Sequence, residues 1–170
     1  MRIYSSKVPT IAQEITRTLL AAKDIESESP KEVEADVAAV LNSYLATEKE
    51  VMELTKELLE RTSRPQSEFS RVKAQIAESK GIKTGEDTLD YLLDQIVEIF
   101  NHSANVDEIY AQDHELRRKM APIFKKHMLM DEALDQEVRL QLKHVTEGSR
   151  TWDIEYARVL EHVKQKRGIR

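Results

Sequence analysis

Histidines and carboxylates are the residues of this 170-residue chain whose types and spacing could do chemistry. His127 and Asp131 are four residues apart, and so are Glu98 and His102, so each pair would share one face of a helix and could bind a metal ion. A di-iron helical bundle needs Glu-x-x-His, and none of the five histidines follows a glutamate at that spacing. We therefore expect no metal and no cofactor, and we interpret His127 as a partly buried packing or hydrogen-bonding residue.

The sequence also lacks the motifs of the common catalytic and phosphate-binding sites. There is no cysteine, which excludes disulfides, thiolate nucleophiles and zinc–thiolate centres. No Gly-x-Ser-x-Gly, P-loop or Gly-x-Gly-x-x-Gly occurs, and the chain has only four glycines. We expect a protein that is not an enzyme. A small metal- or ligand-binding bundle, in which His102, His127 or His144 would converge, remains an alternative.

Basic residues gather in two segments, 117–126 and 158–170, whereas acidic residues concentrate in 24–60 and 86–108. This segregation could create a face that binds phosphate or acidic groups. Alternatively, the basic side chains complement helix C-termini and pair with acidic neighbours. The residues that would form the face are Arg117, Arg118, Lys119, Lys125, Lys126, Arg158, Lys164, Lys166 and Arg167.

The composition predicts an all-α protein. Hydrophobic residues make up 40% and charged residues 34% of the chain, with few glycines, four prolines and 5% aromatics, as is typical of helical bundles. The net charge of −5 gives no global attraction to nucleic acid or to an anionic membrane. No apolar run is long enough to span a membrane or to form a signal peptide, so we expect a cytoplasmic protein.

Apolar residues at helical spacing predict six or seven helices that would position these side chains. The predicted helices begin near Val8, at Pro30, before Phe69, after Gly85 and near Ser149, with a further long segment around Pro122. The second helix should run from about residue 30 to 61, and Pro122 should kink or break the later long segment. The residues expected to line the inner side of the second helix are Val33, Val37, Val40, Tyr44, Thr47, Val51, Leu54 and Leu58.

The two halves of the chain resemble each other. EFSRVKAQIAESKGIK at 68–83 matches EYARVLEHVKQKRGIR at 155–170 at core and non-core positions, and the preceding helices correspond at offsets of about 81 to 87 residues. This pattern predicts an internal duplication into related three-helix halves, 1–83 and 84–170, packed as one helical bundle or as an elongated pair. The alternative is that amphipathic helices look alike by chance. In this alignment His127 falls on Tyr44.

Several stretches resemble a known family. They are SKVPTIAQEI at 6–15, KDIE at 23–26, FSRVK at 69–73, LDYLLDQI at 89–96 and HSANVDEIYAQDHELRRKMAPIFKKHM at 102–128. Together they resemble a family of small bacterial proteins known only as a domain of unknown function, over essentially the whole chain. The resemblance implies a bacterial, cytoplasmic protein and supplies no catalytic or ligand-binding residue.

These observations favour a non-enzymatic interaction protein, an adaptor or regulator that binds a protein partner or a second copy of itself through helix faces. A nucleic-acid or ribosome-associated factor that uses segments 117–126 and 158–170 is the alternative. The adaptor hypothesis predicts an exposed apolar surface. The nucleic-acid hypothesis predicts that the basic residues of 117–126 share one open face with little acid nearby.

Overall fold

The computed structural model describes residues 3–168, with the backbone alone at residue 130. Within that range the fold is all-α, as the composition predicted, with one two-stranded ribbon. The main elements are α1 (Val8–Ala21), β1 (Ile25–Glu26), α2 (Pro30–Thr62), α3 (Phe69–Ser79), α4 (Thr88–His102), β2 (Glu108–Ile109), α5 (Asp113–Gln141) and α6 (Arg150–Lys166). Short 3-10 turns, η1 (Ser5–Lys7), η2 (Gln66–Glu68) and η3 (Gly85–Asp87), precede α1, α3 and α4.

Local sequence signals explain where the long helices start. Pro30 occupies the first turn of α2, where its missing N–H costs no hydrogen bond. Gln112 and Glu115 form a reciprocal capping box at the start of α5. Ser149 accepts a hydrogen bond from the backbone N–H of Trp152 at the start of α6, at 3.2 Å. The predicted starts at Pro30 and near Ser149 are therefore confirmed.

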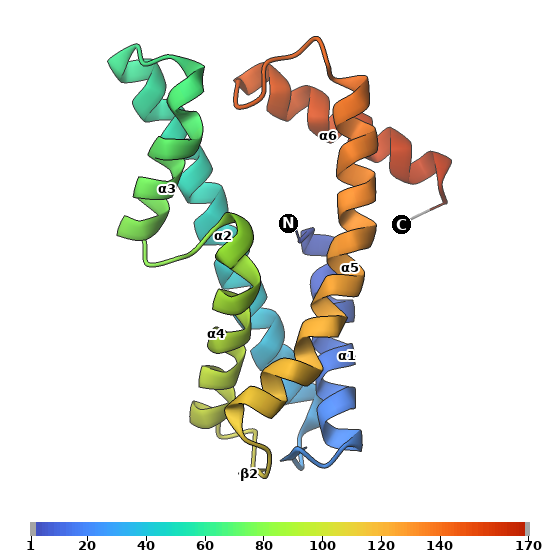
Figure 1. Ribbon diagram of the computed structural model, residues 1–170. Coiled ribbons are helices and arrows are strands. Elements are labelled where there is room, and N and C mark those ends of the chain that lie inside the picture. Colours follow the sequence, from blue (N-terminus) through green and yellow to red (C-terminus); the bar gives the residue numbers. More distant parts are fainter. Residues whose placement is uncertain (1–2, 169–170) are drawn as a thin grey trace.

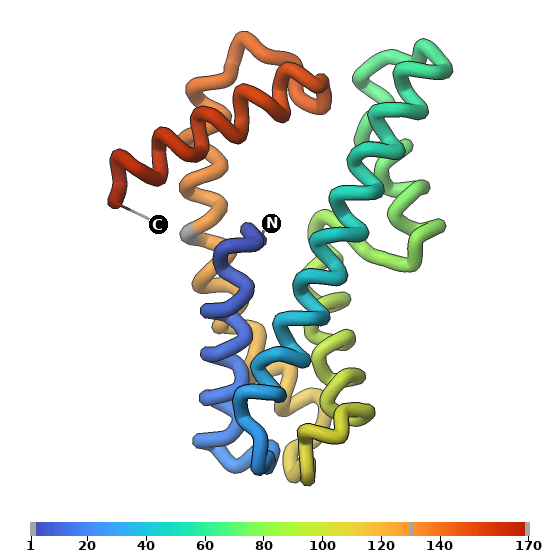
Figure 2. Tube along the Cα trace, turned by 180° about the vertical axis from the view of Figure 1, so that it is seen from behind, coloured from blue at the N-terminus to red at the C-terminus, as the bar shows by residue number. Residues whose placement is uncertain are grey.

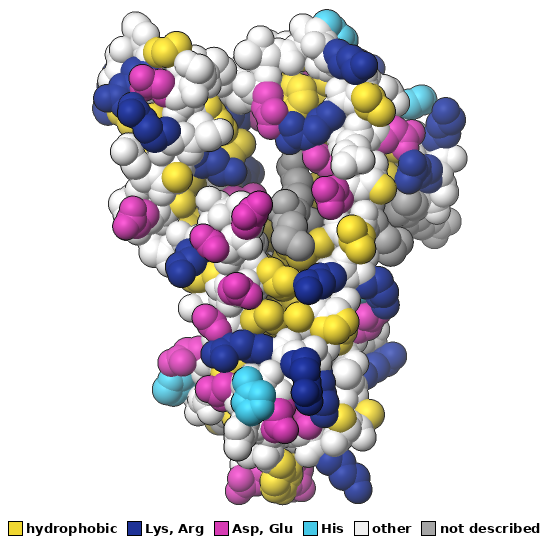
Figure 3. Space-filling model, viewed as in Figure 1, with side chains coloured by type: hydrophobic (Ala, Val, Ile, Leu, Met, Phe, Trp, Pro, Cys, Tyr) yellow, Lys and Arg dark blue, Asp and Glu magenta, His cyan; other side chains and the backbone are white. Residues whose placement is uncertain are grey.

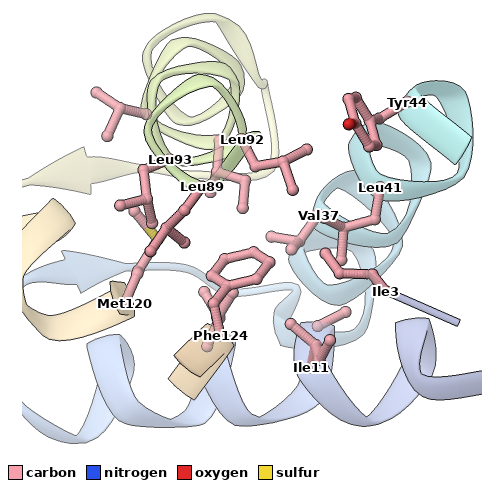
Figure 4. Close-up of a cluster of buried hydrophobic side chains, with 14 of the residues drawn as sticks. Ile3, Ile11, Val37, Leu41, Tyr44, Leu89, Leu92, Leu93, Met120 and Phe124 are labelled. Carbon is pink, nitrogen blue, oxygen red and sulfur yellow. The ribbon is translucent and has the colours of Figure 1, made fainter. Parts of the chain in front are cut away.

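Four helices, α1, α2, α4 and α5, form the base of the molecule and enclose its main core (Figure 1). Each helix buries one apolar stripe, and the stripes meet around fully buried residues such as Ile11, Leu92 and Phe124 (Figure 4). Burial of each such side chain contributes roughly 1.5–3 kcal/mol. The stability of the base therefore comes from the side-chain packing shown in Figure 4.

Two arms rise from this base. The C-terminal half of α2 packs against α3, and the C-terminal half of α5 packs against α6 over a second, smaller core around Trp152 and Tyr156 (Figures 1 and 2). The arms also meet at their tips, where Gln66 Nε2 donates to the carbonyl oxygen of Glu147 at 3.1 Å and Lys56 pairs with Asp153. The tip contact combines these polar interactions with the approach of Gly148 to the Phe69 ring, whereas each arm also has its own apolar packing.

The order of elements in the first half recurs in the second. In each half a helix is followed by a strand, a long helix and a shorter helix, and β1 pairs with β2 in an antiparallel register of Ile25 with Ile109 and Glu26 with Glu108. The packing partners also correspond, because α1 contacts α5 in the base and α4 contacts α2. The predicted duplication requires such a correspondence, and superposition of residues 8–82 on 89–169 would test it; residues 169 and 170 lie outside the described range.

α5 continues through Pro122 without a break. Figure 1 shows that the first turns of α5 lie at an angle to the rest of the helix. The proline removes one backbone donor and crowds the preceding turn, which accounts for a bend at this point. Of the two predicted outcomes, a kink or a break, the helix adopts the kink.

The buried stripe of α2 differs from the predicted one in its details. Val33, Val37, Tyr44 and Val51 are buried as predicted. The other buried side chains of α2 are Leu41, Thr55, Lys56 and Leu59. The remaining positions that were expected to face inward are only partly buried: Val40, Thr47, Leu54 and Leu58. An apolar pattern that alternates spacings of four and three residues repeats every 3.5 residues on average. A straight α-helix has 3.6 residues per turn, so the predicted stripe drifts around the helix axis.

Candidate functional site

A surface groove runs between α2 and α4, with a volume of about 300 Å³. The side chains that line it are Asp36, Ala39, Val40, Ser43, Tyr44, Thr47, Ile82, Tyr91, Gln95 and Ile99. On α2 they run from residue 36 to residue 47, which corresponds to about 16 Å or three helical turns. On α4 they follow the spacing i, i+4, i+8. The lining residues therefore extend along about three turns of α2 and about two turns of α4.

The floor of the groove is apolar and is not fully covered by the protein. Val40, Tyr91 and Ile99 are partly exposed hydrophobic side chains that pack against the main core, and Ile82 closes one end. The rings of Tyr44 and Tyr91 lie beside each other, with their centroids 5.8 Å apart and a tilt of 44°. These side chains present a continuous apolar strip that an incoming helix could cover.

Hydrogen bonds fix Tyr44, the deepest of the lining residues. Its hydroxyl donates to the carbonyl oxygen of Lys83 at 3.2 Å and lies 3.3 Å from the hydroxyl of Thr88. Burial and the nearby carboxylate of Glu48 raise the pKa of Tyr44, so the hydroxyl keeps its proton and remains a donor. The bonds tie α2 to the segment that leads into α4 and hold the two walls at a fixed separation.

Asp36 forms the other end of the groove. Its Oδ2 atom accepts a hydrogen bond from the hydroxyl of Ser103 and one from Nδ2 of Asn105, the latter at 3.1 Å. Both donors are uncharged, so among the described residues no cation is paired with this carboxylate. The hydrogen bonds fix the position of Asp36 and leave its negative charge at the mouth of the groove.

The two helices that form the groove carry more acidic than basic residues, and Asp36 is the one carboxylate among the lining side chains. Residues 30–50 of α2 together with α4 carry eight carboxylates and two lysines. In Figure 3, Asp and Glu side chains gather over α4, whereas Lys and Arg side chains gather over the lower part of α5. The base is therefore electrically asymmetric, with an acidic α2–α4 side and a more basic α1–α5 side.

Five of the nine basic residues singled out in the sequence lie in ion pairs. Arg117 Nε lies 2.7 Å from Asp94 Oδ1, without the alignment of a hydrogen bond. The other pairs are Lys119 with Asp24 at 2.6 Å, Lys126 with Glu14 at 2.8 Å, Arg158 with Glu155 at 2.7 Å, and Arg167 with Glu137. For these five residues, the ion pair with a neighbouring carboxylate is a sufficient structural role for the basic side chain.

The remaining four basic residues do not gather into one cluster. Lys164 places its amino group 5.3 Å from the centroid of the Tyr4 ring. Arg118 and Lys125 are exposed and seven residues apart, on the same side of α5, while Lys166 is exposed near the end of α6. By their spacing, Arg118 and Lys125 lie on one side of α5, and a phosphate-binding face remains a prediction.

The two histidine–carboxylate pairs have different surroundings. His102 Nε2 lies 2.8 Å from Glu98 Oε1 on the exposed face of α4. His127 and Asp131 are buried between α5 and neighbouring elements, and His127 Nε2 lies 3.4 Å from Glu14 Oε1. Nowhere among residues 3–168 do three or more histidine, cysteine or carboxylate side chains converge as metal ligands.

The buried pair is not satisfied by hydrogen bonds. Neither ring nitrogen of His127 and neither carboxylate oxygen of Asp131 has a well-aligned partner within the described part of the chain. Burial raises the pKa of Asp131, against smaller lowering effects from Lys7, the backbone N–H of Tyr4, His127 and Lys164. Of the two predicted roles for His127, packing or hydrogen bonding, the structure supports packing, and the side chain is more buried than predicted.

Sequence reasoning missed the groove because its residues carry the same apolar pattern as the core. Val40 was assigned to the buried stripe of α2, and Tyr91 and Ile99 lie on α4 beside positions that are buried. One signal could have identified the groove. The residues at 36, 43, 47 and 95 are polar, and they flank the apolar positions on the same sides of the two helices.

No helix within residues 3–168 is long and apolar enough to cross a membrane.

The comparisons with known proteins agree with the resemblance noted in the sequence. No curated protein matches the chain. A family model described as protein of unknown function (DUF507) matches residues 1–169. The chain therefore belongs to the DUF507 family.

Proposed function

We propose that the protein is a non-enzymatic interaction protein that binds one helix of a partner protein in the groove between α2 and α4. The observation that carries this proposal is the strip of partly exposed apolar side chains formed by Val40, Tyr91 and Ile99. Covering such a strip removes apolar surface from water and contributes about 25 cal/mol per Å². Because the chain resembles small bacterial proteins, we expect the partner in the bacterial cytoplasm.

The groove is suited to binding because its walls are already fixed. Tyr44 is hydrogen-bonded to the start of the α4 region, and Asp36 holds Ser103 and Asn105 at the end of α4. Binding therefore does not require the walls to become ordered, which removes part of the entropic cost of association. A partner helix would have to supply about three turns with apolar residues on one face.

A nucleic-acid or ribosome-associated function is the second proposal. Its support is the exposure of Arg118 and Lys125 on one side of α5. Three of the five basic residues in segment 117–126 lie in ion pairs with Asp94, Asp24 and Glu14, which reduces the positive charge available to phosphates. This balance favours the protein-binding proposal.

The experiment compares two serine-to-arginine variants in affinity capture from nuclease-treated cells of the source bacterium. Ser43 is exposed and lines the groove, so Ser43→Arg fills the groove without disturbing the core. Ser70 is exposed in the first turn of α3, outside the groove, so Ser70→Arg is the matched control. Circular dichroism and the melting temperature confirm that both variants are folded.

The proposal predicts that Ser43→Arg loses at least one protein that the wild type and Ser70→Arg both retain. Capture that is unchanged in Ser43→Arg would contradict a role for the groove. In a parallel capture from an untreated lysate, proteins that are absent after nuclease treatment and are lost with Arg118→Ala/Lys125→Ala would instead support the nucleic-acid proposal.

A further inference from the structure

We infer that the helix recognised by the groove is basic, with Lys or Arg side chains flanking its apolar face. This inference rests on the proposed function and adds the chemistry of the partner. It follows from the charges around the groove, from the unpaired charge of Asp36 and from the distribution of basic residues over the rest of the base.

Asp36, the one carboxylate among the groove-lining residues, has no ion-pair partner in the described part of the chain. The Asp36 carboxylate accepts hydrogen bonds only from Ser103 and Asn105, which carry no charge. On α4, Glu98 has His102 as its ion-pair partner among the described residues, and Asp90 is exposed with no ion pair within that range. A cation on an incoming helix would therefore meet the Asp36 carboxylate, whose position is already fixed by hydrogen bonds.

Most of the cations of the base lie on α5, although Lys49 of α2 and Lys83, next to Ile82, are exposed on the side of the groove. Lys119 and Lys126 of α5 are engaged with Asp24 and Glu14, and Arg117 reaches only Asp94 at the border of the acidic side. An acidic helix in the groove would face like charges with few cations to offset them. The same charges would attract a basic helix from a distance and orient it on approach.

The groove geometry specifies how such a helix would lie. The tyrosine pair and Ile82 form the apolar end, whereas Asp36 and Ile99 form the acidic end, about two to three turns away on α2. We infer apolar residues at i and i+4 or i+7 over Val40 and Tyr91, with a Lys or Arg at the end nearest Asp36. The aliphatic part of that side chain can lie on Ile99 while its charged group reaches the carboxylate.

The inference is tested without knowledge of the partner, by selection from a display library of helical peptides about three to four turns long. One face of each peptide is apolar, and the remaining positions are drawn equally from Lys, Arg, Glu, Gln and Ser. The library is selected on the wild-type protein and counter-selected on Ser43→Arg. Individual peptides are then measured on wild type, on Asp36→Asn, and on Glu132→Gln, which removes an exposed carboxylate of α5 away from the groove.

We expect groove-dependent peptides enriched in Lys and Arg, with binding weakened roughly three- to five-fold in Asp36→Asn, unchanged in Glu132→Gln and reduced by salt. The asparagine introduced by Asp36→Asn keeps a carbonyl oxygen that can accept from Ser103 and Asn105, so the fold of this variant should be maintained. Groove-dependent peptides that are neutral or acidic would overturn the inference and leave the proposed function standing. A library without any peptide that prefers wild type over Ser43→Arg would overturn both.

A second copy of the chain is the other candidate occupant, because the α1–α5 side is more basic than the α2–α4 side. Light scattering coupled to size-exclusion chromatography distinguishes this case. A concentration-dependent dimer that Ser43→Arg abolishes and Ser70→Arg retains would overturn the inference of a separate basic partner. A monomer at all concentrations supports it.

Discussion

The hydroxyl groups of Tyr44 and Thr88 lie 3.3 Å apart and join the middle of α2 to the first residue of α4. Tyr44 also donates to the carbonyl oxygen of Lys83, in the segment between α3 and α4. The buried side chain of Tyr44 therefore connects α2 both to the segment that follows α3 and to α4, which forms the other wall of the groove. The separation of the groove walls depends on this connection.

Replacement of Tyr44 by Phe should destabilise the fold by about 1–2 kcal/mol, because two hydrogen bonds are lost and the Lys83 carbonyl loses its side-chain donor. Tyr91→Phe is the matched control, since the Tyr91 hydroxyl makes no hydrogen bond within the described residues, and it should change stability by less than about 0.5 kcal/mol. Urea denaturation measures both. Equal effects of the two substitutions would show that the Tyr44 hydroxyl does not hold the walls.

The contact between the tips of the arms depends on Gly148. Its φ of +84° lies in the left-handed region, and a Cβ atom there would overlap Gln66 Nε2 and come within 3.2 Å of the Phe69 ring. Gly148→Ala should therefore cost about 1–2 kcal/mol for the backbone conformation, and about 0.5–1.5 kcal/mol more because the exposed Gln66 side chain must move and lose its hydrogen bond to Glu147.

Gly85→Ala separates these two effects. Gly85 has a φ of +69°, with nothing within 4 Å of the position of an added Cβ, so only the backbone cost applies. Thermal or urea denaturation should show Gly148→Ala as the less stable of the two variants. If the two variants are equally stable, the overlap at position 148 is relieved without an energetic cost, and the contact between the tips contributes little to the position of the arms.

Asp131 should make stability depend on pH in the acidic range. Burial raises the pKa of Asp131 in the folded protein above that in the unfolded chain, despite the lowering effects of Lys7, Tyr4, His127 and Lys164. The folded state therefore favours the protonated acid, and the ionised carboxylate reduces stability as the pH rises from the unfolded pKa through the folded pKa. Asp131→Asn should thus be more stable than the wild type at neutral pH.

The advantage of Asp131→Asn should shrink as the pH falls from the raised folded pKa towards the unfolded pKa of an aspartate, about 4, and should be lost below it. Glu132→Gln, which alters an exposed neighbour, should show no such dependence. Denaturation curves from about pH 3 to about pH 7 provide the comparison. A wild type that is the more stable protein at neutral pH would mean that the ionised carboxylate is satisfied.

Much of the fold could be predicted from the sequence because its signals are local. The starts at Pro30 and Ser149, the bend at Pro122 and the all-α class each follow from residue types within one or two helical turns. The burial of Lys56 could not be predicted in this way. Its partner, Asp153, lies 97 residues away in the chain, and only the meeting of the two arms brings them together.

The candidate site was predicted less well because its contacts join residues that are far apart in the chain. The sequence identified the basic residues but not their partners, since Lys126 meets Glu14 across 112 positions and Lys119 meets Asp24 across 95. It identified Val40 as apolar, but exposure at that position depends on how closely α4 approaches α2. Periodicity assigns a residue to a face of its helix and does not give the distance to the next helix.

The most direct test of the groove is photo-crosslinking in living cells of the source organism. A benzophenone amino acid replaces Ser43 in one strain and Ser70 in the other, and the crosslinked products are identified by mass spectrometry. The proposal predicts a discrete protein crosslinked from position 43 and absent from position 70, and its crosslinked peptide should be an amphipathic helix rich in Lys or Arg. The same products from both positions, or none from position 43, would contradict a partner helix in the groove between α2 and α4.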